Sequence, residues 1–190
     1  LGGRRRAAQR ARMAEHKRIV VVGGGAAGFF AAITAAEALQ AGVAAGTGSG
    51  GTVTLYEATA HLLAKVRISG GGRCNVTHAC FEPRELVKKY PRGGRELIGA
   101  FSRWQPRDTV AWFAARGVEL KAEGDGRMFP VTDDSRTVID CLTRVARNLG
   151  VKCRTHCGVA GVEILPGGGF LVETESGEKI EARCILIATG

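Results

Sequence analysis

The chain has 190 residues, of which 45% are hydrophobic and 24% are charged, and its net charge is +9. This length and balance are those of an ordinary soluble globular domain with a real core. The 28 glycines gather in clusters without a three-residue period, which excludes a collagen-like chain. The glycine clusters are therefore the most informative features of the sequence.

Part of the positive charge is concentrated at the start of the chain. The basic side chains there are Arg4, Arg5, Arg6, Arg10, Arg12, Lys17 and Arg18. The first interpretation is that residues 1–17 form a solvated, disordered tail of a cytoplasmic protein. The second is a remnant of a plastid or mitochondrial targeting segment, because the stretch is rich in Arg and Ala and has no acid before Glu15. Contact with nucleic acid is the least favoured interpretation, because no aromatic residue is interleaved with the arginines.

The six cysteines are scattered along the chain, which suggests a reducing compartment. None lies in a C-x-x-C pair, and no two pairs have zinc spacing. Cys153, His156 and Cys157 are close in sequence, but a strand and a turn there would point their side chains apart. We therefore expect no metal site.

The run from Ile19 to Ala36 carries no charged residue, as a membrane span or a signal peptide would. Three consecutive glycines at 23–25 interrupt this run after a short apolar segment. A strand, a turn and a helix fit the pattern better, so we expect no membrane contact.

The first elements predicted from the pattern form a strand–helix–strand unit. Residues 19–22 are a β-branched run typical of a buried parallel strand, and residues 26–41 are Ala-rich without proline, which predicts a helix. Residues 42–51 resemble an inserted flexible loop, and residues 52–57 predict a second strand. Such a unit implies a right-handed crossover in a parallel sheet.

The rest of the chain predicts a helical middle and a strand-rich end. After a Gly-rich loop at 68–75, helices are expected near 83–90, 94–103, 107–116 and 134–148. Residues 124–130 predict a turn-rich link. The strands expected in a small antiparallel meander, leading into one apolar strand at 184–188, are 151–155, 159–165, 170–174 and 179–182.

The first glycine cluster fits the dinucleotide-binding pattern G-x-G-x-x-G between the first predicted strand and helix. Gly23 permits the tight turn, Gly25 lets a pyrophosphate approach the backbone, and Gly28 lets the helix pack closely on the strand. The amides and dipole of the helix N-terminus favour phosphate. Glu57, at the end of the second predicted strand, is placed to accept ribose hydroxyls, which favours FAD or NAD over NADP.

Three later features favour FAD. The sequence Ile-Ser-Gly-Gly-Gly-Arg-Cys-Asn at 68–75 is a second Gly-rich loop, in which Arg73 could neutralise a phosphate. The meander precedes the final strand, and residues 188–190 end that strand with a turn that can lie against the cofactor. This order of motifs resembles an FAD-binding domain of the glutathione reductase type, an α/β, Rossmann-like fold with a parallel sheet and a small antiparallel β-meander.

Four motifs together resemble one family: V-V-G-G-G-A-A-G, I-S-G-G-G-R-C-N, G-R-M-F-P-V-T-D-D at 126–134, and I-A-T-G. It is the aminoacetone oxidase-like, bile-acid-reductase-like (BaiN-type) family of NAD(P)/FAD-dependent oxidoreductases, and the likeness covers residues 18–190. The resemblance implies an FAD-dependent oxidoreductase in which the loop at 69–75 lies by the pyrophosphate and the flavin. The cofactor-binding residues expected on these grounds are Gly23, Gly25, Ala26, Ala27, Gly28, Glu57, Lys65, Ser69, Gly70, Gly72, Arg73, Cys74, Asn75, Val159, Thr189 and Gly190.

Two features depart from the family pattern. Leu63-Ala64-Lys65 stands where the family usually has Gly-Lys-Lys, and the insertion at 42–51 is unusual. The family's substrate domain and the segments that return from it to the FAD domain are not found in residues 1–190. We therefore expect the N-terminal part of a longer enzyme, in which residues 18–190 form an FAD-binding domain that is incomplete and unstable by itself.

The expected chemistry is NAD(P)H-linked reduction of an enone-like small molecule, or oxidation of an amine, with FAD supplying electron transfer. Cys74 is a candidate catalytic residue, because Arg73 and glycine amides could stabilise its thiolate. A structural role is favoured, because Cys74 has no resolving cysteine at C-x-x-C or C-x-x-x-x-C spacing. Two other functions stay open: a plain NAD-binding Rossmann dehydrogenase and a basic, RNA-associated flavoprotein.

Overall fold

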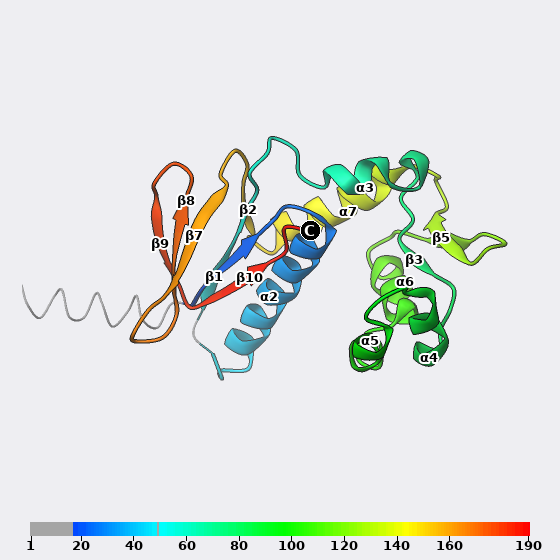
Figure 1. Cartoon of the computed structure of the whole chain (residues 1–190), viewed down its shortest axis with the longest axis horizontal. Helices are drawn as coiled ribbons and strands as arrows, with labels where there is room; N and C mark the ends of the chain where they lie inside the picture. Colours follow the sequence, from blue (N-terminus) through cyan, green and yellow to red (C-terminus); the bar gives the residue numbers. More distant parts are fainter. Residues whose placement is uncertain (1–16, 49) are drawn as a thin grey trace, which may run out of the picture. The chain divides into compact units, whose positions relative to one another are not determined.

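The structure is a computed structural model that describes residues 17–48 and 50–190. Except for Lys17, the predicted basic tail lies outside the described residues. The chain divides into two compact units (Figure 1). Unit 1 comprises the residues up to Ala64 together with Leu142–Gly190, and unit 2 comprises Lys65–Cys141. The range expected as one FAD-binding domain thus contains two units, each with its own sheet.

Unit 1 is built on a four-stranded parallel sheet with the strand order β10-β1-β2-β6. These strands are β1 (Lys17–Val22), β2 (Gly51–Tyr56), β6 (Lys152–Arg154) and β10 (Cys184–Ile187). In the register of the sheet, Val20 lies between Thr54 and Ile185. Val20 is 0% exposed, as expected for a β-branched residue of a parallel sheet that is covered on both faces.

Helix α2 (Ala26–Ala44) packs against β1, β2 and β10 (Figure 1). Its buried residues, Gly28, Phe29, Ala32, Ile33 and Ala36, recur every three or four positions and so form one apolar stripe. By length and composition alone, α2 is apolar enough to cross a membrane. The buried stripe accounts for part of this composition.

An antiparallel meander covers the opposite face of the sheet. It consists of β7 (Val159–Ile164), β8 (Phe170–Thr174) and β9 (Lys179–Ala182). Its core residues Val172 and Ile180 belong to one buried cluster with Val20, Val22 and Tyr56 of the parallel sheet. Successive side chains of a strand point to opposite faces of the sheet. The residues of β1 that alternate with Val20 and Val22 therefore face α2. The predicted parallel sheet with a small antiparallel meander is confirmed.

Unit 2 contains a three-stranded antiparallel sheet with the order β3-β5-β4. Its strands are β3 (Thr77–His78), β4 (Leu120–Ala122) and β5 (Arg127–Pro130). The helical elements of this part of the chain are α3 (Ala64–Ile68), η1 (Ser69–Gly72), α4 (Pro83–Leu86), η2 (Val87–Lys89), α5 (Gly94–Phe101) and α6 (Pro106–Ala114). Buried Phe129, Trp112 and Phe113 make up much of the core of this unit.

Helix α7 (Ser135–Asn148) belongs to unit 2 in its first half and to unit 1 in its second half. Its buried residues Val138, Cys141, Leu142 and Val145 have the helical spacing predicted from the sequence. The chain leaves the helix through Gly150, whose φ is +74°. A left-handed residue just past the last turn is a common helix end and favours glycine.

Three predicted elements differ from the structure. Helix α2 continues to Ala44, so the loop at 42–51 is shorter than expected. Strand β6 pairs in parallel with β2 instead of joining the meander, with Cys153 opposite Leu55. The predicted link at 124–130 contains β5, the central strand of the small sheet in unit 2. Strands of two to four residues are too short to show the alternation on which sequence-based assignment depends.

Candidate functional site

The turn between β1 and α2 requires glycine at two positions. Gly23 has a φ of +109°, and its amide donates a 2.8 Å hydrogen bond to the carbonyl of Tyr56. A Cβ on Gly23 would overlap the carbonyl oxygen of Ala188, and a Cβ on Gly28 would overlap the carbonyl oxygen of Gly23. The backbones of β1, α2 and the end of β10 therefore meet more closely than any side chain would allow.

The N-terminus of α2 is open to a ligand. Gly25 is its N-cap, with no capping hydrogen bond from a side chain, and its first turn contains no acidic residue. A Cβ on Gly25 would meet no atom within 4 Å, and Ala26 and Ala27 are exposed. The first amides of a helix have no acceptor within the helix, and the dipole is positive there. These residues fit a pyrophosphate, the central group of FAD and NAD.

Glu57 follows β2 directly and binds the glycine turn. Its Oε2 accepts a 2.8 Å hydrogen bond from the amide of Gly24, and its Oε1 accepts 2.8 Å hydrogen bonds from the amide and the hydroxyl of Thr59. Burial works to raise the pKa of Glu57, but the hydrogen bonds from Thr59 and Gly24 outweigh it, and the pKa lies below its ordinary value. The ionised carboxylate retains about one lone pair for a ribose hydroxyl, because it has about four acceptor sites and these bonds use three.

The end of β10 and the start of the meander complete the predicted residues of unit 1. Ala188 donates a 2.7 Å backbone hydrogen bond to Val22, which places Thr189 and Gly190 beside the glycine turn. Val159 begins β7 and packs against the core cluster that includes Tyr56. Unit 1 thus brings the fingerprint glycines together with Glu57 and Thr189.

The second glycine cluster forms the short helix η1 of unit 2. Gly70, Gly71 and Gly72 all have positive φ angles, between +58° and +89°. A Cβ on Gly70 would lie 2.7 Å from the ring of Phe129. Ser69 closes the turn, because its carbonyl accepts a 2.9 Å hydrogen bond from the amide of Cys74.

Arg73 is held by side chains that lie far away in the sequence. Its Nη1 is 2.5 Å from Oε1 of Glu123 and 3.5 Å from Oδ1 of Asp133. Its guanidinium also lies 4.0 Å from the ring centroid of Phe129, a cation–π distance. Lys121 pairs with the same Asp133. The phosphate contact expected of Arg73 would therefore have to compete with two carboxylates.

Cys74 is buried, and its φ is +65°, a left-handed conformation that is uncommon for a residue with a side chain. Burial raises the pKa of its thiol, although a hydrogen bond with Ser69 partly offsets this effect. The guanidinium of Arg73 is paired with Glu123 instead of a thiolate. These observations favour the structural role of Cys74 over the catalytic one.

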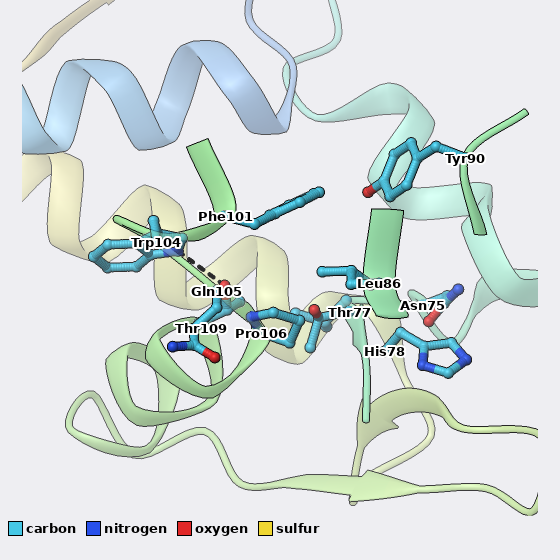
Figure 2. Close-up of a pocket in the computed structure, with 11 residues that line it drawn as sticks. Asn75, Thr77, His78, Leu86, Tyr90, Phe101, Trp104, Gln105, Pro106 and Thr109 are labelled. Carbon is cyan, nitrogen blue, oxygen red and sulfur yellow. Dashed lines mark hydrogen bonds between the residues drawn. The ribbon is translucent and has the colours of Figure 1, made fainter. Parts of the chain in front are cut away.

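The remaining predicted residues of unit 2 are exposed. Lys65 lies in α3, and Asn75 follows the loop and lines a cavity (Figure 2). Contact of these residues with FAD stays a prediction. Sequence reasoning missed Glu123, Asp133 and Phe129 as partners of the second loop. Phe129 and Asp133 belong to the motif at 126–134, so the sequence marked both as part of a family motif. It did not indicate that they contact Arg73.

Within the described residues, no group of three or more His, Cys, Asp or Glu side chains is arranged to hold a metal ion. The features that could hold a ligand in unit 1 are backbone amides at a helix N-terminus and one carboxylate. Together with the parallel sheet, they define a Rossmann-type dinucleotide-binding domain, and the meander gives it the form of an FAD-binding domain.

The chain matches the HI0933-like protein Rossmann domain family over residues 17–190 and belongs to that family. This is a family of FAD-dependent oxidoreductases, as the motifs predicted.

Two curated relatives are similar in sequence. The 3-dehydro-bile acid delta(4,6)-reductase of Clostridium scindens is 27% identical over 156 residues, which are 82% of this chain and 37% of that protein. The ribosomal RNA dihydrouridine synthase of Escherichia coli is 26% identical over 126 residues, which are 66% of this chain and 30% of that protein. The chain thus spans about a third of the length of these relatives.

Among solved structures, the 3-ketosteroid-delta4-(5alpha)-dehydrogenase of Rhodococcus jostii RHA1 is similar with a TM-score of 0.61. The identity is 17%, and the match covers 92% of this chain and 46% of that chain. At this identity the likeness shows the fold.

Proposed function

We propose that the protein carrying this chain is an FAD-dependent reductase that adds two hydrogens to a carbon–carbon double bond conjugated with a carbonyl, with NAD(P)H as the electron donor. The observation that carries the proposal is the open α2 N-terminus beside Glu57, which fits the pyrophosphate and ribose of FAD. Support for the reaction comes from the names of the two curated relatives. A delta(4,6)-reductase and a dihydrouridine synthase both remove ring double bonds.

The residues of this chain contribute binding and orientation. The amides that begin α2 would hold the pyrophosphate, and Glu57 would hold the ribose while its bond to Gly24 fixes the turn. Bound FAD supplies hydride transfer, the chemistry that no amino-acid side chain provides. The substrate is a small molecule, or a larger molecule in which one small ring is reduced.

The experiment follows the visible flavin absorption of the purified full-length protein without oxygen. Addition of NADH or NADPH should bleach the flavin band, and subsequent addition of an α,β-unsaturated ketone should restore it. Bleaching by amines but not by NAD(P)H would instead identify an amine oxidase. A protein without a flavin spectrum, which binds NAD alone, would be a plain Rossmann dehydrogenase.

A further inference from the structure

Two residues in unit 1 hold the carboxylate of Glu57, and Thr59 makes more of the bonds than Gly24 does. The amide and the hydroxyl of Thr59 both donate to Oε1 of Glu57 at 2.8 Å, and the amide of Gly24 donates to Oε2 at 2.8 Å. Because both oxygens are bonded, the carboxylate cannot rotate without losing at least one of these bonds. Thr59 belongs to none of the sequence motifs.

The backbone of Thr59 is fixed by the turn that follows β6. The carbonyl of Thr59 accepts a 3.0 Å hydrogen bond from the amide of His156, and the carbonyl of Glu57 accepts a 2.9 Å bond from the amide of Cys157. The amide of Glu57 donates a 2.8 Å bond to the carbonyl of Arg154. Residues 57–59 therefore continue the pairing of β2 with β6 past the ends of both strands. This pairing fixes the position from which Thr59 reaches the carboxylate.

Gly24, the second of the three consecutive glycines, is enclosed by the same segment. Its amide donates to Glu57, and its carbonyl accepts a 2.8 Å hydrogen bond from the amide of Leu63. A Cβ on Gly24 would lie 2.7 Å from the side chain of Leu62 and 3.0 Å from Cβ of Glu57. The pattern G-x-G-x-x-G leaves this position open to any residue. The need for glycine here comes from the segment 57–63, which packs directly on the turn.

The hydroxyl of Thr59 has a second partner, His61. It accepts a 3.3 Å hydrogen bond from the amide of His61, while its own proton can go to Glu57 at 2.8 Å or to the carbonyl of His61 at 3.4 Å. The bond to Glu57 is the stronger of the two, because it is shorter and its acceptor is charged. Thr59 is exposed, so burial of its side chain does not explain this arrangement. Only threonine and serine carry a hydroxyl on Cβ that can make both bonds.

We infer that Thr59 is a positioning residue of the cofactor site and acts through Glu57. Three of the roughly four acceptor sites of the carboxylate are used by Thr59 and Gly24, so the remaining one has a fixed direction. A ribose hydroxyl of FAD donates to this remaining site. A carboxylate that is oriented before the ligand arrives lowers the entropic cost of binding. The inference rests on the FAD site of the proposed function, and on neither its reaction nor its substrate.

The test measures the affinity of the flavin-stripped, full-length protein for FAD by the change in flavin fluorescence on binding. Thr59→Val removes the hydroxyl but keeps the β-branched shape, and it should weaken FAD binding by about threefold to tenfold, the scale of one hydrogen bond. Thr59→Ser keeps the hydroxyl and should bind FAD nearly as tightly as the wild type. Thr34→Val is the matched control, because Thr34 is an exposed threonine of α2 whose hydroxyl donates to the carbonyl of Phe30 at 2.8 Å. This control should keep wild-type affinity.

A double-mutant cycle with Glu57→Ala separates positioning from a merely structural role. If Thr59 acts through Glu57, Thr59→Val should weaken FAD binding in the wild-type background and have no further effect in Glu57→Ala, because no carboxylate remains to be oriented. An equal loss of affinity in both backgrounds would overturn the inference. Equal affinity of the Thr59→Val and Thr59→Ser variants would overturn it as well, because the hydroxyl would then make no difference.

These measurements need no turnover, so the positioning role and the proposed reaction can fail separately. A protein that shows the coupling between Thr59 and Glu57, but whose flavin NAD(P)H does not reduce, would contradict the proposed reaction and support the positioning role. A protein whose flavin NAD(P)H reduces, but whose Thr59→Val and Thr59→Ser variants bind FAD equally well, would contradict the positioning role alone.

Discussion

The two glycine-rich loops of this chain have different supports. The loop at 23–28 is held by backbone: it packs against Ala188, hydrogen-bonds to Tyr56, and receives one side-chain acceptor, Glu57. The loop at 69–75 is held by side chains, through Phe129 and the pairing of Arg73 with Glu123 and Asp133. The first loop leaves the amides that begin α2 open for a ligand, whereas the second has its charged group, Arg73, already paired.

This difference predicts how each loop responds to mutation. Changes in the first loop should act on the cofactor, because its backbone is both the turn and the binding surface. Changes around the second loop should act first on the stability of unit 2. The following variants of the full-length protein separate the two effects.

The largest effect is expected for Phe129→Ala. Phe129 is 0% exposed, contacts the turn at Gly70 and lies under the guanidinium of Arg73. Removing a buried aromatic ring should lower the free energy of unfolding by about 3–5 kcal/mol. Denaturant titration measures the change, with the exposed Phe81→Ala as control. Equal stability of the two variants would show that Phe129 does not support the second loop.

Gly28→Ala should cost about 3 kcal/mol, the upper end of the range for overpacking, because the new methyl group overlaps the carbonyl of Gly23. Gly25→Ala is the matched control, because a Cβ there meets nothing within 4 Å. The control should fold normally but bind FAD more weakly, since its methyl group obstructs the approach of the pyrophosphate. If Gly25→Ala keeps full FAD affinity, the pyrophosphate does not lie at this turn.

Glu57→Gln should weaken FAD binding by about 1–3 kcal/mol, the scale of a charge-assisted hydrogen bond. The pKa of Glu57 is lowered in the folded protein, so the stability it contributes is present above the ordinary glutamate pKa and is lost as pH falls through the lowered value. Wild-type protein should therefore retain FAD below the pH at which an exposed glutamate protonates. Fluorescence of the released flavin during acid titration measures the loss of FAD as the pH falls. If Glu57→Gln shows the same loss over the same pH range, a group other than Glu57 is responsible.

The smallest effect is expected for Arg73→Gln. Its side chain is 33% exposed, and pairs of this kind contribute little because water screens them. The melting temperature should fall by no more than a few degrees. A large loss of FAD with an unchanged melting temperature would show that Arg73 leaves Glu123 for a phosphate when the cofactor binds.

The contrast between the two loops also separates what the sequence could predict from what it could not. The unit from β1 through α2 to Glu57 was predicted because each step is local: an apolar run, a glycine turn, a helix and an acid. The small sheet of unit 2 was missed because its strands have two to four residues. The partners of Arg73 were missed because Glu123 is 50 positions away and nothing in the pattern pairs them.

The basic segment at 83–116 was overlooked for another reason. The seven basic side chains at the start of the chain dominate the net charge and hide the smaller excess of positive charge at 83–116. Only the fold showed that part of this segment lines a cavity with Tyr90, Phe101 and Trp104. Charge bias over a window shorter than a domain is the signal that could have found it.

The most direct test of the central claim is identification of the cofactor in the full-length protein. Purified protein should be yellow, and denaturation should release one non-covalent FAD per chain, identified by chromatography and mass spectrometry. Glu57→Gln should carry substantially less. A colourless protein that takes up no FAD when the cofactor is added, or one that releases only NAD, would contradict the account.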